Sequence, residues 1–181
     1  MQNPATLAPA LTTSNAGCIL RALAIMSSVP FWSYPSRMSD CELCRSSENN
    51  VIWDDGLCRV VLVDGAEGAA FPGYCRVVWH QHVKEMSDLA AADRRHLMNV
   101  VLSVETALRS LLSPDKINLA SLGNQVPHLH WHIIPRWQND SRFPAPIWAE
   151  AIRMVDVRNP PDSSALRSAI IACLAEEECG S

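Results

Sequence analysis

Three histidines alternate with large apolar residues in one short segment of this chain. Residues 128–137 read His-Leu-His-Trp-His-Ile-Ile-Pro-Arg-Trp. Alternate side chains of a β-strand share a face, so His128, His130 and His132 are predicted to lie side by side, roughly 6.6–7 Å apart along the strand. The apolar residues between them would then face the core. Half of the chain's 6 histidines would line one surface, which favours a chemical role over a purely structural one.

An imidazole face supports metal ligation, or nucleophilic and acid–base chemistry near neutral pH. The loop before the histidines holds a glycine, Gly123, and three amide side chains, those of Asn118, Asn124 and Gln125. Amide and backbone N–H groups can bind phosphate oxygens without competing with a nucleophile. No cluster of carboxylates suited to Mg²⁺ accompanies the histidines. The pattern therefore favours phosphate chemistry on a histidine, and we expect the reaction to require no cofactor.

A second motif, Cys41-Glu-Leu-Cys44, precedes the first apolar segments. A C-x-x-C pair can bind a metal ion, undergo redox chemistry, or consist of two plain core thiols. The chain has 7 cysteines, an odd number. The apolar stretch 18–29 is interrupted by Arg21 and lacks a basic region before it, which disfavours a secretory signal. We therefore predict reduced thiols in a cytoplasmic protein.

Composition divides the chain into three parts. Its 181 residues, 48% of them hydrophobic, are sufficient for one domain with short appendages. Residues 1–37 contain no Asp or Glu and are predicted to form a poorly ordered extension, followed by a domain over 38–153 and a tail over 154–181. The net charge of -4 argues against a nucleic-acid binder, which usually has a basic face. No apolar run is long enough to cross a membrane.

The apolar pattern predicts strands, then a long helix, then further strands. The strands are expected at 51–54, 59–63, 74–79, 116–121 and 128–134, the first two joined by a hairpin turn at Asp55-Gly56. A helix is expected from an N-cap at Ser87 to about residue 113. Its apolar stripe comprises Leu97, Val101, Val104, Leu108 and Leu111. An amphipathic helix is expected at 163–176. This order favours the α+β class with an antiparallel sheet.

The segment from His128 to Ile134 matches the pattern His-φ-His-φ-His-φ-φ, where φ is hydrophobic. The chain thereby resembles the histidine triad (HIT) family of nucleotide hydrolases and transferases, with motifs in family order over residues 41–148. The segment 143–148 is similar to a bacterial branch named after diadenosine tetraphosphate hydrolysis. The resemblance implies an α+β fold with a five-stranded antiparallel sheet and one long helix, paired as a homodimer; the C-terminal helix is expected from the amphipathic pattern alone.

The resemblance also implies roles for the residues of the site. The three histidines would form the catalytic set, with His130 attacking the α-phosphorus of a nucleotide. His132 and Asn118 would support the phosphate. Asn124 and Gln125 would bind it or reach the leaving side, although the family often has Gly-Gln where this chain has Gly-Asn-Gln, which leaves the two amide roles open.

Two further sets of residues follow from the resemblance. Asp64 matches a position that often binds ribose hydroxyls. Zinc-binding members of the family use positions that match Cys41, Cys44, His82 and His128 here. Two thiolates and two imidazoles would form a closed, structural zinc site. His80 is an alternative ligand because it lies two residues from His82.

Three functions are compatible with these residues. The first is hydrolysis of an α-phosphate linkage, in a dinucleoside polyphosphate or another AMP-linked compound, through a nucleotidyl intermediate on His130. The second is transfer of the nucleotidyl group to an acceptor other than water. The third is a non-catalytic nucleotide-binding dimer. The partners that we expect are a nucleotide of the purine class and a second copy of the chain, with no nucleic acid and no membrane.

Overall fold

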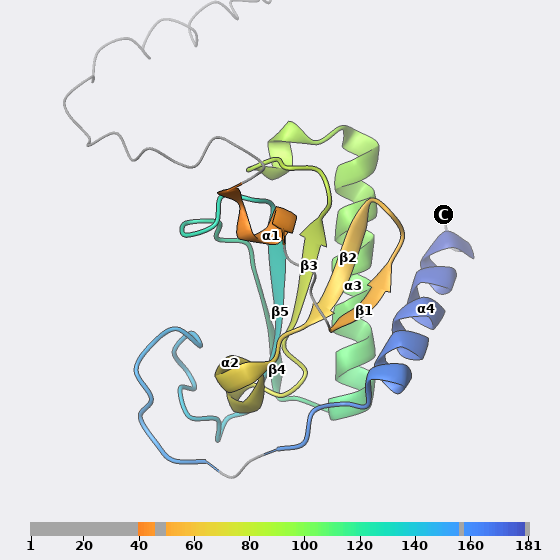
Figure 1. Ribbon diagram of the computed structural model, residues 1–181. Coiled ribbons are helices and arrows are strands. Elements are labelled where there is room, and N and C mark those ends of the chain that lie inside the picture. The colour runs from red at the N-terminus through yellow and green to blue at the C-terminus, as the bar shows by residue number, and fades with distance from the viewer. Residues whose placement is uncertain (1–39, 46–49, 156–157, 180–181) are drawn as a thin grey trace, which may run out of the picture. The chain divides into compact units, whose positions relative to one another are not determined.

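A five-stranded antiparallel sheet forms the centre of the molecule (Figure 1). The computed structural model describes residues 40–45, 50–155 and 158–179, so the extension expected over 1–37 lies outside the described residues. The strands are β1 (Val51–Asp54), β2 (Cys58–Leu62), β3 (Cys75–Trp79), β4 (Lys116–Ala120) and β5 (His130–Arg136). Their order in the sheet is β1-β2-β3-β5-β4, and every neighbouring pair is antiparallel. The predicted α+β class and sheet are confirmed.

The turn between β1 and β2 forms where the Asp-Gly pair predicts it. Gly56 has φ of 85°, a conformation that glycine adopts without steric cost. The carboxylate of Asp54 accepts the Gly56 backbone N–H at 2.7 Å, and that of Asp55 accepts the backbone N–H groups of Leu57 and Cys58, each at 2.9 Å. These bonds close the hairpin turn with residues that are neighbours in the chain.

One long helix, α3 (Ala91–Leu112), packs on the core face of the sheet. The helix ends at Ser113 as predicted, with a left-handed backbone of φ 46°. Its predicted start was wrong, because Ser87 lies in a separate short helix, η2 (Met86–Asp88), that is closed by a capping box between Glu85 and Asp88. Leu111, predicted to belong to the buried stripe, is 40% exposed. Helical periodicity predicts the direction in which a side chain points, but not whether another element covers it there.

The C-terminal helix α4 (Ser163–Cys179) packs against α3 and β1. Leu166 and Ile170, one turn apart, are both fully buried in the same core as α3. The Asp162 carboxylate accepts the Ala165 backbone N–H at 2.9 Å and so caps the helix. Within the described residues, no helix is long and apolar enough to cross a membrane.

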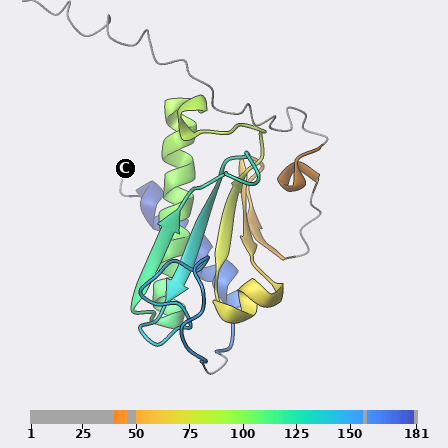
Figure 2. The same cartoon turned by 90° about the vertical axis from the view of Figure 1, so that its left-hand side faces the viewer.

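The opposite face of the sheet carries the polar side chains of β5. Figure 2 shows the sheet side-on, with α3 and α4 on one side and the short helices α1 (Glu42–Arg45) and α2 (Gly65–Ala70) on the other. The Arg59 guanidinium of β2 donates to the Leu43 carbonyl oxygen at 2.8 Å and holds α1 on this face.

Strand β5 begins at His130, so the prediction that His128 lies in the same strand was wrong. His128 belongs to the loop before β5, and its ring does not line up with those of His130 and His132.

Candidate active site

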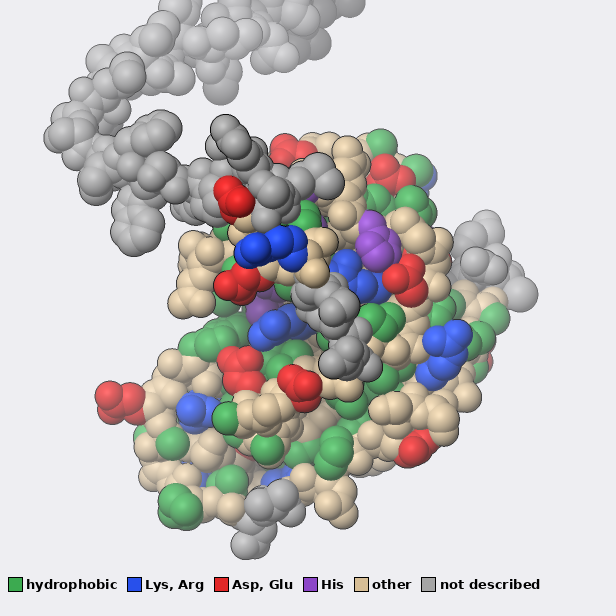
Figure 3. All heavy atoms as spheres, in the orientation of Figure 1, with side chains coloured by type: hydrophobic (Ala, Val, Ile, Leu, Met, Phe, Trp, Pro, Cys, Tyr) green, Lys and Arg blue, Asp and Glu red, His purple; other side chains and the backbone are tan. Residues whose placement is uncertain are grey.

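A cleft of about 440 Å³ opens on the polar face of the sheet. Its lining includes His130 and His132 of β5, residues 122–126 of the loop before β5, and the side chains of Glu67, Arg76 and Trp148. Figure 3 shows the surface hollowed between α1 and α2, with histidine inside and charged side chains around the opening. The sequence brings these groups together because β3 and β5 are neighbours and antiparallel.

His130 has a defined proton position. Its Nδ1 lies 2.6 Å from the backbone carbonyl oxygen of His128. A carbonyl oxygen only accepts, so Nδ1 carries the proton and Nε2 carries the lone pair. His130 is 8% exposed and lines the cleft. A neutral imidazole whose Nε2 carries the lone pair is a competent nucleophile near neutral pH.

His132 is held as a neutral hydrogen-bond donor. The Tyr74 hydroxyl lies 2.5 Å from its Nδ1, and the Nε–H of Arg76 points at the Tyr74 oxygen from 3.5 Å. Because Tyr74 accepts from arginine, its own proton is directed to His132 Nδ1, and His132 Nε2 carries a proton. Burial lowers the pKa of His132 to about 3, and repulsion from the protonated form of His130 and from the Arg76 charge acts in the same direction. At neutral pH His132 therefore offers an N–H group without a positive charge.

The remaining triad histidine, His128, turns away from the cleft. Its Nε2 donates to the Trp79 carbonyl oxygen at 2.6 Å, which leaves the lone pair on Nδ1. That Nδ1 lies 3.5 Å from the Cys41 thiol, 3.4 Å from the Cys44 thiol and 3.3 Å from His82 Nδ1. Cys44 Sγ and His82 Nδ1 are 3.3 Å apart. Residues from α1, the loop after β3 and the loop before β5 thus converge on one point.

These four side chains match a tetrahedral metal site in donor type and spacing. Zinc bonds of about 2.0–2.1 Å to nitrogen and 2.3 Å to sulfur place tetrahedral ligands roughly 3.3–3.8 Å apart. The ligand atoms of Cys41, Cys44, His82 and His128 all lie within 4.8 Å of one another. Burial, the neighbouring Cys41 thiol and its charge raise the pKa of Cys44 to about 11. The alternative ligand His80 instead contacts the Asp54 carboxylate at 3.0 Å.

The predicted phosphate-binding residues separate into two groups. Asn124 and Gln125 line the cleft beside His130 and His132. Asn118 lies on β4 and its side-chain oxygen accepts from the buried Arg136 at 2.9 Å. Asp64 precedes α2 and accepts from the Asn50 amide at 2.8 Å. Asn118 and Asp64 are not among the side chains that line the cleft.

Sequence reasoning missed three residues of the site: Tyr74, Arg76 and Glu67. Arg76 and His132 are direct partners across β3 and β5, and Arg76 also forms an ion pair with Glu67 at 3.2 Å. Alternation along the predicted strand 74–79 places Tyr74 and Arg76 on one face, which is a usable signal. The register that sets that face beside the histidines is a tertiary property.

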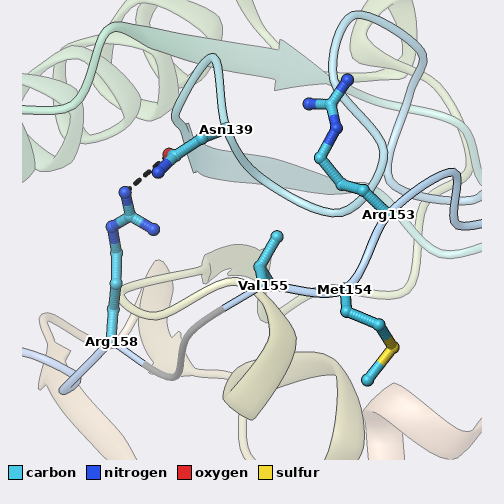
Figure 4. Close-up of a pocket in the computed structure, with 5 residues that line it drawn as sticks. All are labelled: Asn139, Arg153, Met154, Val155 and Arg158. Atoms are coloured by element: carbon cyan, nitrogen blue, oxygen red, sulfur yellow. Dashed lines mark hydrogen bonds between the residues drawn. The ribbon is translucent and has the colours of Figure 1, made fainter.

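Another hollow lies at the start of the C-terminal tail (Figure 4). It is lined by Asn139, Arg153, Met154, Val155 and Arg158, and Arg158 donates to the Asn139 side-chain oxygen at 2.7 Å. These five side chains include no nucleophile and no general base. The cleft that contains His130 is therefore the candidate active site.

The low pKa of His132 predicts a loss of stability in acid. Between about pH 6.5 and pH 3 the unfolded chain protonates this histidine and the folded chain does not, so stability decreases as the pH falls through this window and is unaffected above it. His132→Gln removes the titrating group. Wild type is expected to lose more unfolding free energy than His132→Gln between pH 7 and pH 4, by on the order of 2 kcal/mol. Urea titrations at both pH values measure it, and equal losses would contradict it.

Comparisons with known proteins agree with this geometry. The HIT domain family model matches residues 45–139, more than half of the chain. The AP-4-A phosphorylase of Mycobacterium tuberculosis is 28% identical over 78 residues, which are 40% of this chain and 40% of that relative. The chain thus spans well under half the length of this curated relative.

Two solved structures extend the likeness to the fold. A histidine triad protein from Bradyrhizobium japonicum is 28% identical with a TM-score of 0.52, covering 80% of this chain and 96% of that one. A histidine triad (HIT) protein from Sinorhizobium meliloti is 26% identical with a TM-score of 0.51, covering 71% and 89%. With the histidine-lined cleft and the five-stranded sheet, these matches show that the chain belongs to the histidine triad family.

Proposed function

We propose that this protein hydrolyses a nucleotide at its α-phosphate linkage through a covalent nucleotidyl intermediate on His130. The observation that carries the proposal is the bond from His130 Nδ1 to the His128 carbonyl, which leaves the Nε2 lone pair in the cleft. Substrates of this class are dinucleoside polyphosphates and other AMP-linked compounds. The acidic chain, of net charge -4, fits a small nucleotide better than a nucleic acid.

The first step forms the bond between His130 Nε2 and the α-phosphorus and breaks the bond from phosphorus to the leaving group, which takes the electron pair. In this intermediate the His130 ring is bonded to phosphorus at Nε2 and protonated at Nδ1, so the ring carries a positive charge. The His128 carbonyl oxygen stabilises that charge because it accepts a hydrogen bond from Nδ1–H. In the second step water attacks the phosphorus and loses a proton to the solvent, the electron pair of the N–P bond returns to Nε2, and His130 becomes neutral again.

Neighbouring donors stabilise the charge on the non-bridging oxygens in both steps. His132 Nε2–H faces the cleft, as do the amides of Asn124 and Gln125. We assign Asn118 a supporting role at the phosphate, on the same sheet face as His132 and next to Arg136. Asp64 is proposed to bind the ribose hydroxyls of a purine nucleotide.

A transferase is the second candidate, because the matched relative is named a phosphorylase. The same intermediate would then react with inorganic phosphate or another acceptor instead of water. Product analysis with and without inorganic phosphate separates the two: hydrolysis releases AMP in both cases, whereas phosphorolysis releases a product with one more phosphate only when phosphate is present.

Replacing His130 tests the covalent mechanism. His130→Ala is expected to abolish turnover and leave the fold intact, because the side chain faces the cleft and its neighbour Leu129 fills the core. His132→Ala removes one donor and is expected to cost roughly 10²–10³-fold. Quenched wild-type enzyme should carry an acid-labile nucleotidyl group that maps to His130. His80→Ala, which changes a histidine bonded to Asp54 outside the cleft, is the matched control.

A His130→Ala protein that turns over at near wild-type rate would refute the nucleophile assignment. A wild-type protein that binds AMP but cleaves none of these linkages would support the non-catalytic alternative.

We further propose that Cys41, Cys44, His82 and His128 hold one structural Zn²⁺. The ion would supply no step of the reaction; it would bind α1 to the loops before β5 and after β3. Through His128 it would also fix the carbonyl that orients His130. Among the described cysteines none forms a disulfide, in keeping with a reducing cytoplasm. The site lies within the proposed domain over residues 38–153.

Removal of one zinc ligand tests this site. Wild type is expected to carry about one zinc per chain, and Cys41→Ser to lose most of it together with thermal stability, because a structural zinc contributes directly to folding. Cys173→Ser, which changes a partly buried thiol on α4, should retain the zinc. Elemental analysis and thermal unfolding give both readouts. Metal-free wild-type protein with unchanged stability after addition of zinc would contradict the proposal.

Finally, we propose that two copies pair along β4. This strand is an edge of the sheet, bonded only to β5 among the described strands, and beside it lies a hollow lined largely by apolar side chains, Ile117, Leu119 and Trp148 among them. Exposed apolar edges are normally covered. Sedimentation equilibrium at micromolar concentration is expected to give a dimer that dissociates on dilution. A monomer throughout would refute the pairing.

A further inference from the structure

Arg76 is the single Lys or Arg side chain among the described residues that line the cleft. Burial lowers the pKa of His132, so its ring is neutral near pH 7, and the amides of the loop are uncharged. Its neighbours with full charge are the carboxylates of Glu42 and Glu67. A substrate with several phosphates therefore meets one permanent positive charge in this cleft, which makes the placement of Arg76 informative.

The guanidinium of Arg76 is held in a defined direction. Its Nη2 forms the ion pair with Glu67 at 3.2 Å, and its Nε–H is directed at the Tyr74 hydroxyl at 3.5 Å. An arginine side chain has five N–H donors in one plane, so it can keep both contacts and still donate to a ligand. Planar, charged donors of this kind suit a phosphate group.

The ion pair contributes little to folding. The side chains of Arg76 and Glu67 are 31% and 42% exposed, and pairs at such positions stabilise a protein by about 0–1 kcal/mol. Glu67 comes from α2, whereas Arg76 comes from β3. An ion-paired arginine that lines a cleft with so little gain in stability is better explained by its effect on a ligand.

The register of the sheet places Arg76 next to the reacting group but not at it. The partner of His130 across the strands is Val78, and the partner of Arg76 is His132. Arg76 is thus one row further along the sheet, roughly 6.6–7 Å from the row of the nucleophile. A phosphorus bonded to His130 Nε2 and held by His132 has its next phosphate within reach of that row.

We propose that Arg76 binds the phosphate adjacent to the α-phosphate, and that this contact directs the site toward nucleotides with a phosphoanhydride leaving group. The inference rests on the function proposed above and names its substrate class. When the bond between the α-phosphorus and the bridging oxygen breaks, the electron pair goes to the departing phosphate. Arg76 neutralises the charge that grows there. A phosphoramidate, whose leaving group is an amine, has no such phosphate for Arg76 to bind.

Nucleotide binding can be measured apart from turnover in a variant that lacks the proposed nucleophile. In the His130→Ala background, ADP carries the additional phosphate and AMP lacks it. Addition of Arg76→Met is expected to weaken ADP binding by roughly 10–100-fold, as one charged hydrogen-bonded contact is lost. AMP binding should weaken at least tenfold less. Calorimetric titration measures both Kd values, and Arg76→Lys, which keeps the charge but loses the planar donors, should restore ADP binding in part.

Turnover provides the second readout. For diadenosine tetraphosphate, kcat/KM of Arg76→Met is expected to fall roughly 10²-fold, with a loss for AMP phosphoramidate at least tenfold smaller. Arg95→Met, an exposed arginine on α3, is the matched control. Equal losses on both substrates, or an unchanged ratio of ADP to AMP affinity, would overturn the role of Arg76 while leaving the His130 mechanism in place. If the His130→Ala protein binds neither nucleotide and wild type cleaves neither substrate, the proposed function itself fails.

Discussion

The hydrogen bond between the His130 ring and the backbone of His128 is the interaction on which the candidate site depends. At 2.6 Å it assigns the proton of His130 to Nδ1 and the lone pair to Nε2. The His128 carbonyl can do this only because its own ring is fixed from the other end, by the Trp79 carbonyl at Nε2 and by the Cys-His cluster at Nδ1. The Cys-His cluster and the His130 ring therefore lie at two ends of one short, hydrogen-bonded segment.

The three histidines of the motif are thus not equivalent. His128 belongs to the cluster, His130 presents a lone pair, and His132 presents a proton that the Tyr74 hydroxyl holds in place. Burial favours the neutral form of His132 and lowers its pKa, because a charged ring would lose hydration in the interior. The three histidine rings differ in which nitrogen carries the proton and in where that nitrogen points, because each ring has a different hydrogen-bond partner.

The sheet provides the frame for these contacts. Strands β3 and β5 are central, and their apolar residues pack under α3 and α4. The alternation of the strands then directs the other half of their side chains to the opposite face, where Arg76 and His132 meet across the pair. Antiparallel sheets commonly pack one face against the core and leave the other toward solvent. Here the second face carries the candidate site.

Much of this protein follows from local sequence. The alternating pattern around His130, the Asp55-Gly56 turn and the apolar stripe of α3 depend on neighbours in the chain, and the strands and the helix end formed where these signals predict them. The spacing of the triad, with the resemblance that it supports, indicated the family. Other features needed the tertiary structure: that His128 leaves the strand, that Asn118 contacts Arg136, and that Tyr74, Arg76 and Glu67 join the site. Each of these depends on strand register and on loops that bring residues far apart in the chain within hydrogen-bond distance, and neither composition nor periodicity encodes such a distance.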